Sequence, residues 1–505
     1  MTMKFILSID IGTTAIKGAV IGEDGIIYGH QTSEYPLITL ATGEVEQSID
    51  VYEKAFKNAI SGAIAEAKIA PSQITCMGFS ATGETVVFMD EQGRALRNVM
   101  AWMDLRAIAE AEYLTTLFPV EEILSKTGAP SFRPSFLASK ILWVKKHEPE
   151  IFARTKTFAL IKDYFIYHLT GHCVSEASLM CDAGYWNMDT HQWWPEMLKI
   201  LGIDAEQLPE VVEPGTELGT ISAKAAKQYG LDPHTKINVG GMDQACGAVG
   251  AGNIRPGIVS ESTGSALVAV FISDSFRYDP IGSIPMFCAG LPHQYMFQPF
   301  STGAIVMKWF RDEFCELEKM ISSKSGINTY NLIDAEAEKV EAGSAGLILL
   351  PYFQGSGSPD VNKRAKGVYY GITATHTKGH FARAIMEGLA MALRRMVEAT
   401  EPLSGKVQEI RSLGGGAKSK IWCQIKADIL GIPVKVLDNS ENTACMGAAI
   451  LAGVANGIWP SVPYAVEKFI TVSQIYFPNP HYKEVYGKTY EKYVEISETL
   501  QKTFG

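Results

Sequence analysis

The chain has 505 residues, of which 47% are hydrophobic and 20% are charged, the composition of an ordinary soluble globular enzyme. Because a single hydrophobic core rarely grows past about 250–300 residues, this length predicts two or three domains. The formal net charge of −10 argues against a general nucleic-acid-binding protein, although backbone amides or a metal ion could still neutralise an anionic ligand locally.

The eight cysteines carry no recognisable metal or redox motif. None forms a Cys-x-x-Cys pair, and no Cys/His cluster has zinc spacing, so we expect most of them to be small buried hydrophobic residues. The opening MTMKFILSIDIG is apolar for only a few residues before Asp10, which predicts a strand and not a signal peptide. No apolar run approaches membrane-spanning length. We therefore expect a protein of the reducing cytoplasm that binds neither membranes nor nucleic acid.

The first part of the chain alternates strands, turns and helices. Apolar runs and helical spacing predict strands at residues 4–9, 15–21, 74–80 and 85–89, and helices at 51–67 and through most of 105–169. The dipeptide Asp24-Gly25, shortly after the second strand, is a hairpin signal.

The sequence NIRPG at residues 253–257 predicts a break, and we place domains at 1–252 and 253–505. Directly after the break, VSESTGSALVAVF has the same strand, turn and strand pattern as SIDIGTTAIKGAV near the start, which suggests two halves of similar architecture. Further helices are expected at 381–399, 421–430 and 444–455, and strands at 410–413 and 434–437. Strands interleaved with helices in both halves predict an α/β protein.

The segment Asp10-Ile-Gly-Thr-Thr follows the first predicted strand. Gly12 permits a tight turn whose N–H groups could face phosphate oxygens, Thr13 and Thr14 add hydroxyl donors, and Lys17 could reach a phosphate. Asp10 could hold Mg²⁺ directly or through water. The alternative is an ordinary hairpin with an Asx-type turn. The segment is not a P-loop, because it lacks Gly-Lys-Ser/Thr.

Two further turns are candidate nucleotide contacts. Residues 262–265, STGS, could form a matching hairpin that binds phosphates, although a plain β-turn is the better explanation of so short a string taken by itself. Residues 413–419, LGGGAKS, follow a predicted strand and open a helix, so adenine or ribose could lie on the glycine backbone. A flexible strand-to-helix connection is the alternative.

The candidate acceptor side consists of TGET at residues 82–85 and AWMDLR at 101–106. Carboxylates such as Glu84 and Asp104 accept hydrogens from polyol hydroxyls, and an aromatic face such as that of Trp102 packs on sugar carbons. Each residue also has a structural explanation, and Arg106 could simply pair with Asp104.

Asp243 stands in INVGGMDQACGAVGAG, at the end of a predicted strand and at the start of a small-residue helix. A carboxylate held there could accept the proton of a hydroxyl as phosphoryl transfer proceeds. The alternative role is to cap a helix that begins at Gln244, and the two roles are compatible.

These motifs, in this order, resemble those of the FGGY carbohydrate kinases of the actin-like ATPase superfamily, and the resemblance covers nearly the whole chain. It includes DIGTTAIKG, GGMDQACGAVGAG, LGGGAKSKIWCQIKADILGIPV and ENTACMGAAILAG. The tail FPNPHYKEVYGKTYEKY is similar to the final helix of xylulokinase-type members, and WFRDEFCELEKM at residues 309–320 resembles the autoinducer-2 kinase branch.

The resemblance implies an actin-like fold of two ribonuclease-H-like α/β domains flanking a deep catalytic cleft, with ATP and Mg²⁺ as cosubstrate and cofactor. It implies that the sugar site, the first phosphate hairpin and the catalytic Asp lie in the first domain, and the nucleotide site in the second. The implied general base is Asp243, and the implied metal ligands are Asp10 and Asp243. The implied substrate-binding residues are Thr82, Gly83, Glu84, Trp102, Asp104 and Asp243. The implied nucleotide-binding residues are Gly12, Thr13, Thr14, Lys17, Thr263, Gly264, Gly303, Gly415, Gly416, Ala417 and Ser419.

The acceptor is expected to be a small sugar, with a pentulose such as xylulose as the leading candidate. Gluconate, a glycerol-like polyol or an autoinducer-2-like compound are the alternatives, because Gly83-Glu84 stands where xylulokinases and gluconate kinases usually carry Met-His. A non-catalytic sugar- or nucleotide-binding regulator and an actin-like filament protein are the other functional classes. A nicotinamide dehydrogenase is disfavoured, since no Gly-x-Gly-x-x-Gly follows the first strand. Dimers are common among the similar proteins, so a homodimer is the assembly that the resemblance suggests.

Overall fold

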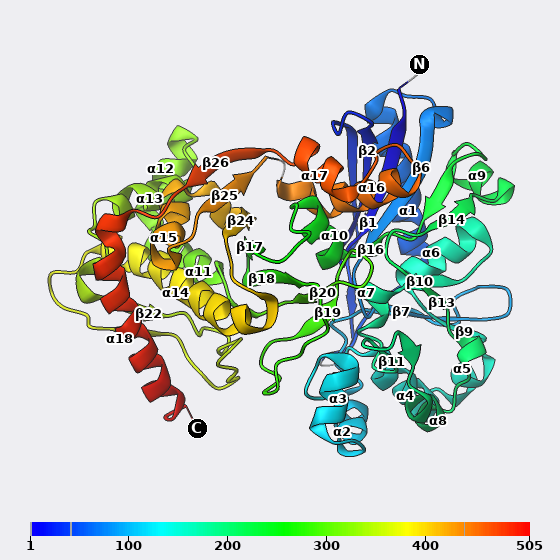
Figure 1. Cartoon of the computed structure of the whole chain (residues 1–505), viewed down its shortest axis with the longest axis horizontal. Coiled ribbons are helices and arrows are strands. Elements are labelled where there is room, and N and C mark those ends of the chain that lie inside the picture. Colours follow the sequence, from blue (N-terminus) through cyan, green and yellow to red (C-terminus); the bar gives the residue numbers. More distant parts are fainter. Residues whose placement is uncertain (1–2, 41–42, 439, 505) are drawn as a thin grey trace. The chain divides into compact units, whose positions relative to one another are not determined.

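The computed structural model describes residues 3–40, 43–438 and 440–504, and the chain divides into two compact units (Figure 1). Unit 1 comprises Met1–Ile254, Met286–Met296 and Asn442–Thr471, and unit 2 comprises Arg255–Pro285, Phe297–Glu441 and Val472–Gly505. The first break falls beside the predicted boundary at 252/253. Two segments that the prediction assigned to the second domain, 286–296 and 442–471, instead pack with unit 1.

The central sheet of unit 1 has helices on both faces. Its strand order is β14–β15–β6–β1–β2–β3, with β16 also paired to β6, and the bounds are β1 (Phe5–Ile11), β2 (Ala15–Gly22), β3 (Ile27–Glu34), β6 (Ile74–Ala81), β14 (Glu217–Thr220), β15 (Lys236–Asn238) and β16 (Gly241–Met242). On β1, Leu7 and Ile9 point into the core that contains α1 (Ile49–Ala67), whereas Ile6 points into the core that contains α16 (Thr443–Ala455). A strand buried on both faces needs a continuous apolar run, which explains why FILSIDI is so hydrophobic.

The rest of unit 1 is a second sheet with a helical segment and several short elements. The second sheet has the order β4–β5–β8–β7–β9, with bounds β4 (Ile38–Thr39), β5 (Val45–Gln47), β7 (Val86–Met89), β8 (Val99–Met100) and β9 (Thr157–Leu160). The helices are α2 (Ile108–Thr116), α3 (Val120–Thr127), α4 (Leu137–His147), α5 (Pro149–Arg154), α6 (Ile161–Thr170), α7 (Ala177–Met180), α8 (Pro195–Leu201), α9 (Ala223–Tyr229), α10 (Asp243–Gly250) and α17 (Val462–Phe469). The remaining strands are β10 (Val174–Glu176), β11 (Trp186–Asn187), β12 (Gln192–Trp193), β13 (Glu210–Val212), β19 (Met286–Cys288) and β20 (Tyr295–Phe297), whose last residue belongs to unit 2.

Unit 2 is also α/β. Strands β18, β17, β24, β25 and β26 lie side by side in this order, and β21 pairs with β18. The bounds are β17 (Ile258–Thr263), β18 (Ala266–Ser273), β21 (Phe300–Thr302), β22 (Ile348–Leu350), β23 (Val368–Tyr370), β24 (Glu409–Leu413), β25 (Val434–Leu437), β26 (Val472–Tyr476), α11 (Ile305–Phe314), α12 (Glu316–Ser325), α13 (Thr329–Glu338), α14 (Lys378–Ser404), α15 (Lys420–Leu430) and α18 (Lys483–Gln501). The long helix α14 packs against α13, α15, β18 and β22 (Figure 1).

The predicted echo between the two halves is confirmed at the level of local structure. β1 and β2 form an antiparallel pair that closes at residues 12–14, and β17 and β18 form an antiparallel pair that closes at 264–265. In each unit a parallel strand pairs with the first strand of the hairpin, β6 in unit 1 and β24 in unit 2.

Helix α16 belongs to unit 1 because small residues let it approach α10 very closely. A Cβ atom added at Gly447 would lie 1.8 Å from the Cys246 carbonyl oxygen, and one added at Gly250 would lie 1.8 Å from the Thr443 carbonyl oxygen. α16 also packs on β1 and β6. This long-range packing explains why the stretch 442–471 joins the first unit.

We expect Gly447→Ala to destabilise unit 1 by about 1–3 kcal/mol, because the added methyl overpacks a backbone-to-helix contact. Gly247→Ala is the matched control within α10, since no neighbouring atom lies within 4 Å of its added Cβ, and it should stabilise the helix by about 0.5–1 kcal/mol. Urea unfolding midpoints measure both changes. Equal midpoints for the two variants would contradict the packing described for α10 and α16.

Candidate active site

Three parallel strands of unit 1 bring the predicted catalytic residues to one edge of the sheet. β6 lies between β1 and β16, and both Asp10 and Gly241 are paired with Ser80. The carboxyl ends of β1, β6 and β16 therefore lie level. Asp10, the TGET turn at residues 82–85 and Asp243 all emerge there, where open α/β sheets bind their ligands.

Helix α10 begins at Asp243 itself, with Met242 as its N-cap and no side-chain cap bond. The capping role that assumed a helix start at Gln244 is thereby corrected. The Gln244 N–H donates to Asp243 Oδ1 at 2.6 Å, which orients the carboxylate from within the first turn. Burial, the nearby charge of Asp10 and that of Glu84 raise the pKa of Asp243 to about 7, against the opposing effect of the Gln244 hydrogen bond.

Asp10 is almost completely buried and is held by its neighbours in the sheet. Ser80 Oγ donates to Asp10 Oδ1 at 2.8 Å, and Lys17 is its pairing partner across the β1–β2 hairpin. Burial raises the pKa of Asp10, whereas the Ser80 hydrogen bond and the Lys17 charge lower it. A partly desolvated carboxylate of this kind would gain from a nearby cation.

The first hairpin turn is fixed by a short hydrogen-bond network. The Gly12 N–H donates to the Ala15 carbonyl at 3.0 Å, and the Tyr35 hydroxyl donates to the Gly12 carbonyl at 2.5 Å. Trp102 Nε1 donates to Thr13 Oγ1 at 2.8 Å while 40% of Trp102 remains exposed. The predicted phosphate turn and the predicted acceptor loop are thus directly linked, and Thr14 in the same turn is exposed.

Glu84 occupies a strained position that a buried lysine supports. Its φ is +54°, a left-handed conformation that costs a non-glycine residue about 1–2 kcal/mol. Lys140 Nζ donates to the Glu84 carbonyl at 2.7 Å and to the Ala101 carbonyl at 2.8 Å, and the Ser135 hydroxyl donates to Glu84 Oε1 at 2.7 Å. Burial lowers the pKa of Lys140 to about 8. Such strain is typical of positions where a side chain must face a ligand.

Asp182 is a candidate site residue that the motif analysis missed. It is buried, and a Cβ added at Gly83 would lie 3.8 Å from its Oδ2 and 3.5 Å from Met242 Sδ. Burial raises the pKa of Asp182 well above its usual range, with further contributions from Glu84 and Asp243 and an opposing one from Arg133. The only signal in the sequence is a lone carboxylate inside the apolar stretch SLMCDAGYW.

Asp104 has a structural role that differs from its predicted contact with substrate. It is fully buried, and Oδ2 accepts the Val45 N–H at 2.7 Å while the Arg106 guanidinium donates to both oxygens. Arg106 also pairs with Glu46 at 2.8 Å. Because neither oxygen is open to a ligand, we leave Asp104 out of the proposed site.

Unit 2 contains a pocket of about 380 Å³ lined by five of the seven nucleotide residues predicted in this unit, a volume suited to a small organic ligand. The predicted residues that line it are Thr263, Gly264, Gly415, Gly416 and Ser419. Ala417 lies between two of these. The predicted Gly303 lies beside the lining residue Ala304, whose N–H donates to the Gly264 carbonyl at 2.7 Å.

The other wall of the pocket comes from α11 and the start of α13, which no motif indicated. Asn328, Tyr330, Asn331 and Asp334 line it. Burial raises the pKa of Asp334 to about 6 against an opposing hydrogen bond from Ser419. These side chains offer the polar contacts that a base or ribose would need at the edge of an otherwise apolar pocket.

Two domain comparisons decide what family this geometry belongs to. Residues 5–250 match the N-terminal domain, and residues 273–456 the C-terminal domain, of the FGGY family of carbohydrate kinases. The chain belongs to the FGGY family of carbohydrate kinases. It is therefore an ATP-dependent sugar kinase, and the predicted α/β fold with two actin-like kinase domains is confirmed.

FGGY kinases with different substrates are similar to this chain. The xylulose kinase of Bacillus subtilis (strain 168) is 28% identical, over 98% of this chain and 97% of its own length. The gluconokinase of the same strain is 32% identical, over 90% of this chain and 88% of its own length. The crystal structure of ligand-bound xylulose kinase from Lactobacillus acidophilus superposes with a TM-score of 0.89 at 26% identity, covering 99% of both chains.

Two further features of this FGGY kinase follow from the structure. Among the helices within residues 3–40, 43–438 and 440–504, none combines the length and hydrophobicity needed to cross a lipid bilayer. Seven of the eight cysteines are buried and all are free thiols, as the sequence predicted.

Proposed function

We propose that this kinase transfers the γ-phosphoryl group of ATP to a hydroxyl of a neutral pentulose such as xylulose, with Asp243 as the general base. We choose a neutral acceptor because several carboxyl groups gather at the edge of the unit 1 sheet where β1, β6 and β16 end. Asp10, Glu84, Asp182 and Asp243 all contribute carboxyl groups there, and their charges act on one another's pKa values.

An anionic acceptor such as gluconate would add a further negative charge to this edge. If about 6 Å separates the acceptor charge from an ionised carboxylate, at an effective dielectric constant of about 20, their repulsion would disfavour binding by roughly 3 kcal/mol before screening by other groups. Arg133 is the cation whose charge acts on Asp182. The hydroxyls of a neutral sugar, in contrast, can donate to an ionised carboxylate or accept from a protonated one.

The chemistry proposed for Asp243 is a single proton transfer. The acceptor hydroxyl donates a hydrogen bond to the Asp243 carboxylate, its oxygen forms the new bond to the γ-phosphorus, and the bond to the β-phosphate oxygen breaks to release ADP. The hydroxyl proton ends on Asp243. The bond from Gln244 N–H to Oδ1 holds the carboxylate in one orientation during this transfer.

The residues present also fit the nucleotide and the metal. The glycine turns and Asn331 in the unit 2 pocket would hold a nucleotide, and Gly12, Thr13, Thr14 and Lys17 of unit 1 would contact phosphate oxygens. Asp10 and Asp243 would hold Mg²⁺, since burial and the charge of Asp10 both raise the pKa of Asp243 and a cation would favour its ionised form. When bound, Mg²⁺ would neutralise charge on the transferred phosphoryl group.

Glu84→Gln tests whether the carboxyl groups select a neutral acceptor. We expect the variant to lower the ratio of kcat/KM for xylulose to that for gluconate by about 10-fold, because one repelling charge is removed. ADP release with each sugar measures the ratio. Glu150→Gln, an exposed carboxylate on α5, is the control and should leave it unchanged. A ratio that does not move in Glu84→Gln would overturn the electrostatic basis for the neutral acceptor.

A further inference from the structure

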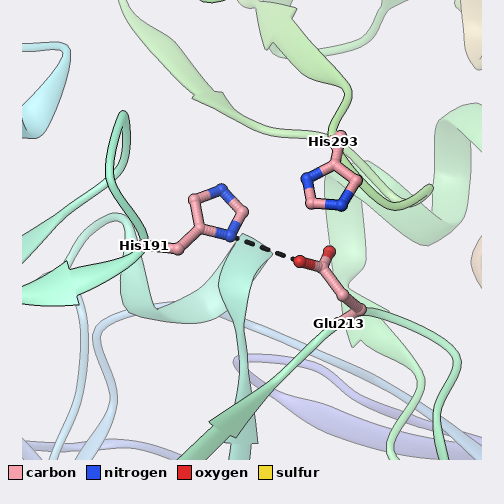
Figure 2. A group of neighbouring side chains, drawn as sticks. All are labelled: His191, Glu213 and His293. Atoms are coloured by element: carbon pink, nitrogen blue, oxygen red, sulfur yellow. Dashed lines mark ion pairs between the residues drawn. The ribbon is translucent and has the colours of Figure 1, made fainter.

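Three loops of unit 1 bring together two histidines and a glutamate, none of which is assigned a role in phosphoryl transfer (Figure 2). His191 lies in the turn between β11 and β12, Glu213 directly follows β13, and His293 lies in the turn between β19 and β20. One ligand atom of each, a ring nitrogen or a carboxylate oxygen, lies within 4.8 Å of the other two. The figure shows both imidazole rings close to the Glu213 carboxylate.

The spacing is close to that of a first-row metal site. In a tetrahedral site with metal–ligand bonds of about 2.0–2.1 Å, neighbouring ligand atoms lie about 3.3 Å apart. His191 Nδ1 and Glu213 Oε1 are already 3.3 Å apart. The remaining separations, at most 4.8 Å, require movement of about 1.5 Å, and the exposed His293 side chain stands on a turn where a rotamer change is enough.

Both histidines have a backbone conformation and ring contacts that a simple surface residue would not need. His191 and His293 have φ values of +53° and +57°, two of only six left-handed residues other than glycine among the described residues. Their rings lie with centroids 5.9 Å apart at 29°, and the His191 ring packs on Trp186 at 4.9 Å. Non-glycine residues in this conformation cluster at ligand sites.

We propose that His191, Glu213 and His293 bind a Zn²⁺ ion. Two imidazole nitrogens and one carboxylate are a common zinc donor set, with the fourth position left to water. The buried Cys288 thiol neighbours His191 and would supply the outer contact that fixes the orientation of a ligating ring. The ion would join the β11–β12 turn, the end of β13 and the β19–β20 turn.

The donor set also predicts which ions are rejected. Mg²⁺ and Ca²⁺ prefer oxygen ligands, whereas imidazole suits Zn²⁺ and neighbouring first-row ions. Zn²⁺ binding should therefore persist in excess Mg²⁺, which would also fill the proposed Asp10–Asp243 site. Measuring Zn²⁺ binding in excess Mg²⁺ therefore tests the zinc site independently of the kinase mechanism, on which the zinc proposal does not depend.

The test is a Zn²⁺ titration of the metal-free full-length protein in excess Mg²⁺, by competition with a chromogenic chelator. We expect one Zn²⁺ per chain and at least ~10-fold weaker binding in each of His191→Gln, Glu213→Gln and His293→Gln. His234→Gln, an exposed histidine of the same unit, should bind Zn²⁺ like the wild type. The visible spectrum of the Co²⁺-substituted wild type should show tetrahedral coordination, and that of the His293→Gln variant should not.

Thermal unfolding gives a second, independent measurement. Zn²⁺ should raise the Tm of the wild type and of His234→Gln, because the ion binds only the folded chain, and should raise the Tm of the three ligand variants much less. A wild type that binds Zn²⁺ no more tightly than these variants would overturn the proposal, and so would an equal loss in His234→Gln. In that case His191 and Glu213 form an ion pair alone.

Discussion

Replacing Asp243 with asparagine should lower kcat by about 10³-fold, within the range of roughly 10²–10⁴ that a general base contributes. Asparagine keeps the size of the side chain and can still accept the Gln244 N–H through its carbonyl oxygen, but it cannot take the proton of the acceptor hydroxyl. The affinity for ATP in the absence of Mg²⁺ should change little, because the proposed nucleotide pocket lies in unit 2. Single-turnover ADP formation and a nucleotide-binding titration measure the two effects.

A loss of stability should not accompany this loss of activity. Burial and the charge of Asp10 both raise the pKa of Asp243, so the neutral asparagine removes a buried charge and a repulsion from the folded state. The unfolding midpoint should therefore stay equal or rise. Asp50→Asn is the matched control, since Asp50 also stands in the first turn of a helix, α1, but is exposed. Activity of Asp243→Asn within 10-fold of the wild type would show that the base is another residue.

The second large effect is expected at a buried ion pair beneath the nucleotide pocket. Glu261 on β17 and Lys426 on α15 are both buried, and Lys426 Nζ bonds the Glu261 carboxylate. Lys426 also donates to Thr263 Oγ1 at 2.9 Å, and Thr263 donates to Glu261 Oε2 at 2.7 Å. The Ser412 hydroxyl contacts both charged groups. This network fixes the side chain of Thr263, which lines the pocket.

Lys426→Met should destabilise unit 2 by about 3–5 kcal/mol, because it leaves the Glu261 carboxylate buried without a partner. The same variant should raise the KM for ATP, since Thr263 loses a hydrogen bond that holds it. Denaturant unfolding and initial rates at varied ATP measure both changes.

The double variant Glu261→Met/Lys426→Met is the informative comparison. Removing both charges leaves no unpaired group, so most of the stability should return, whereas the KM for ATP should stay high. Lys488→Met breaks a fully exposed pair with Glu484 on α18 and should change neither quantity measurably. A Lys426→Met variant as stable as Lys488→Met would contradict the role given to the network.

Local sequence patterns predicted the elements that carry the site. The apolar runs before Asp10 and Thr263 predicted the first strand of each hairpin, because a strand buried on two faces admits few polar residues. Helix α14 was expected at 381–399 and runs as Lys378–Ser404. The prediction began the helix three residues late, because the residues of its first turn do not show the helical spacing of apolar residues.

Long-range contacts were beyond these patterns. Nothing local in ENTACMGAAILAG shows that α16 packs with α10 in unit 1, although its small residues indicate close packing of some kind. Asp182 and Asp334 come to their sites through tertiary structure, outside any glycine motif. Asp104 had the residue type of a sugar ligand, and only its burial beside Arg106 showed a structural role.

A competition experiment tests the proposed function most directly. Wild-type enzyme is given Mg·ATP with equal concentrations of xylulose, gluconate and glycerol, and the phosphorylated products and ADP are quantified together. We expect xylulose phosphate as the main product, formed in equal amount to ADP. Gluconate phosphate as the main product, or ADP formed without any phosphorylated acceptor, would contradict the proposed function.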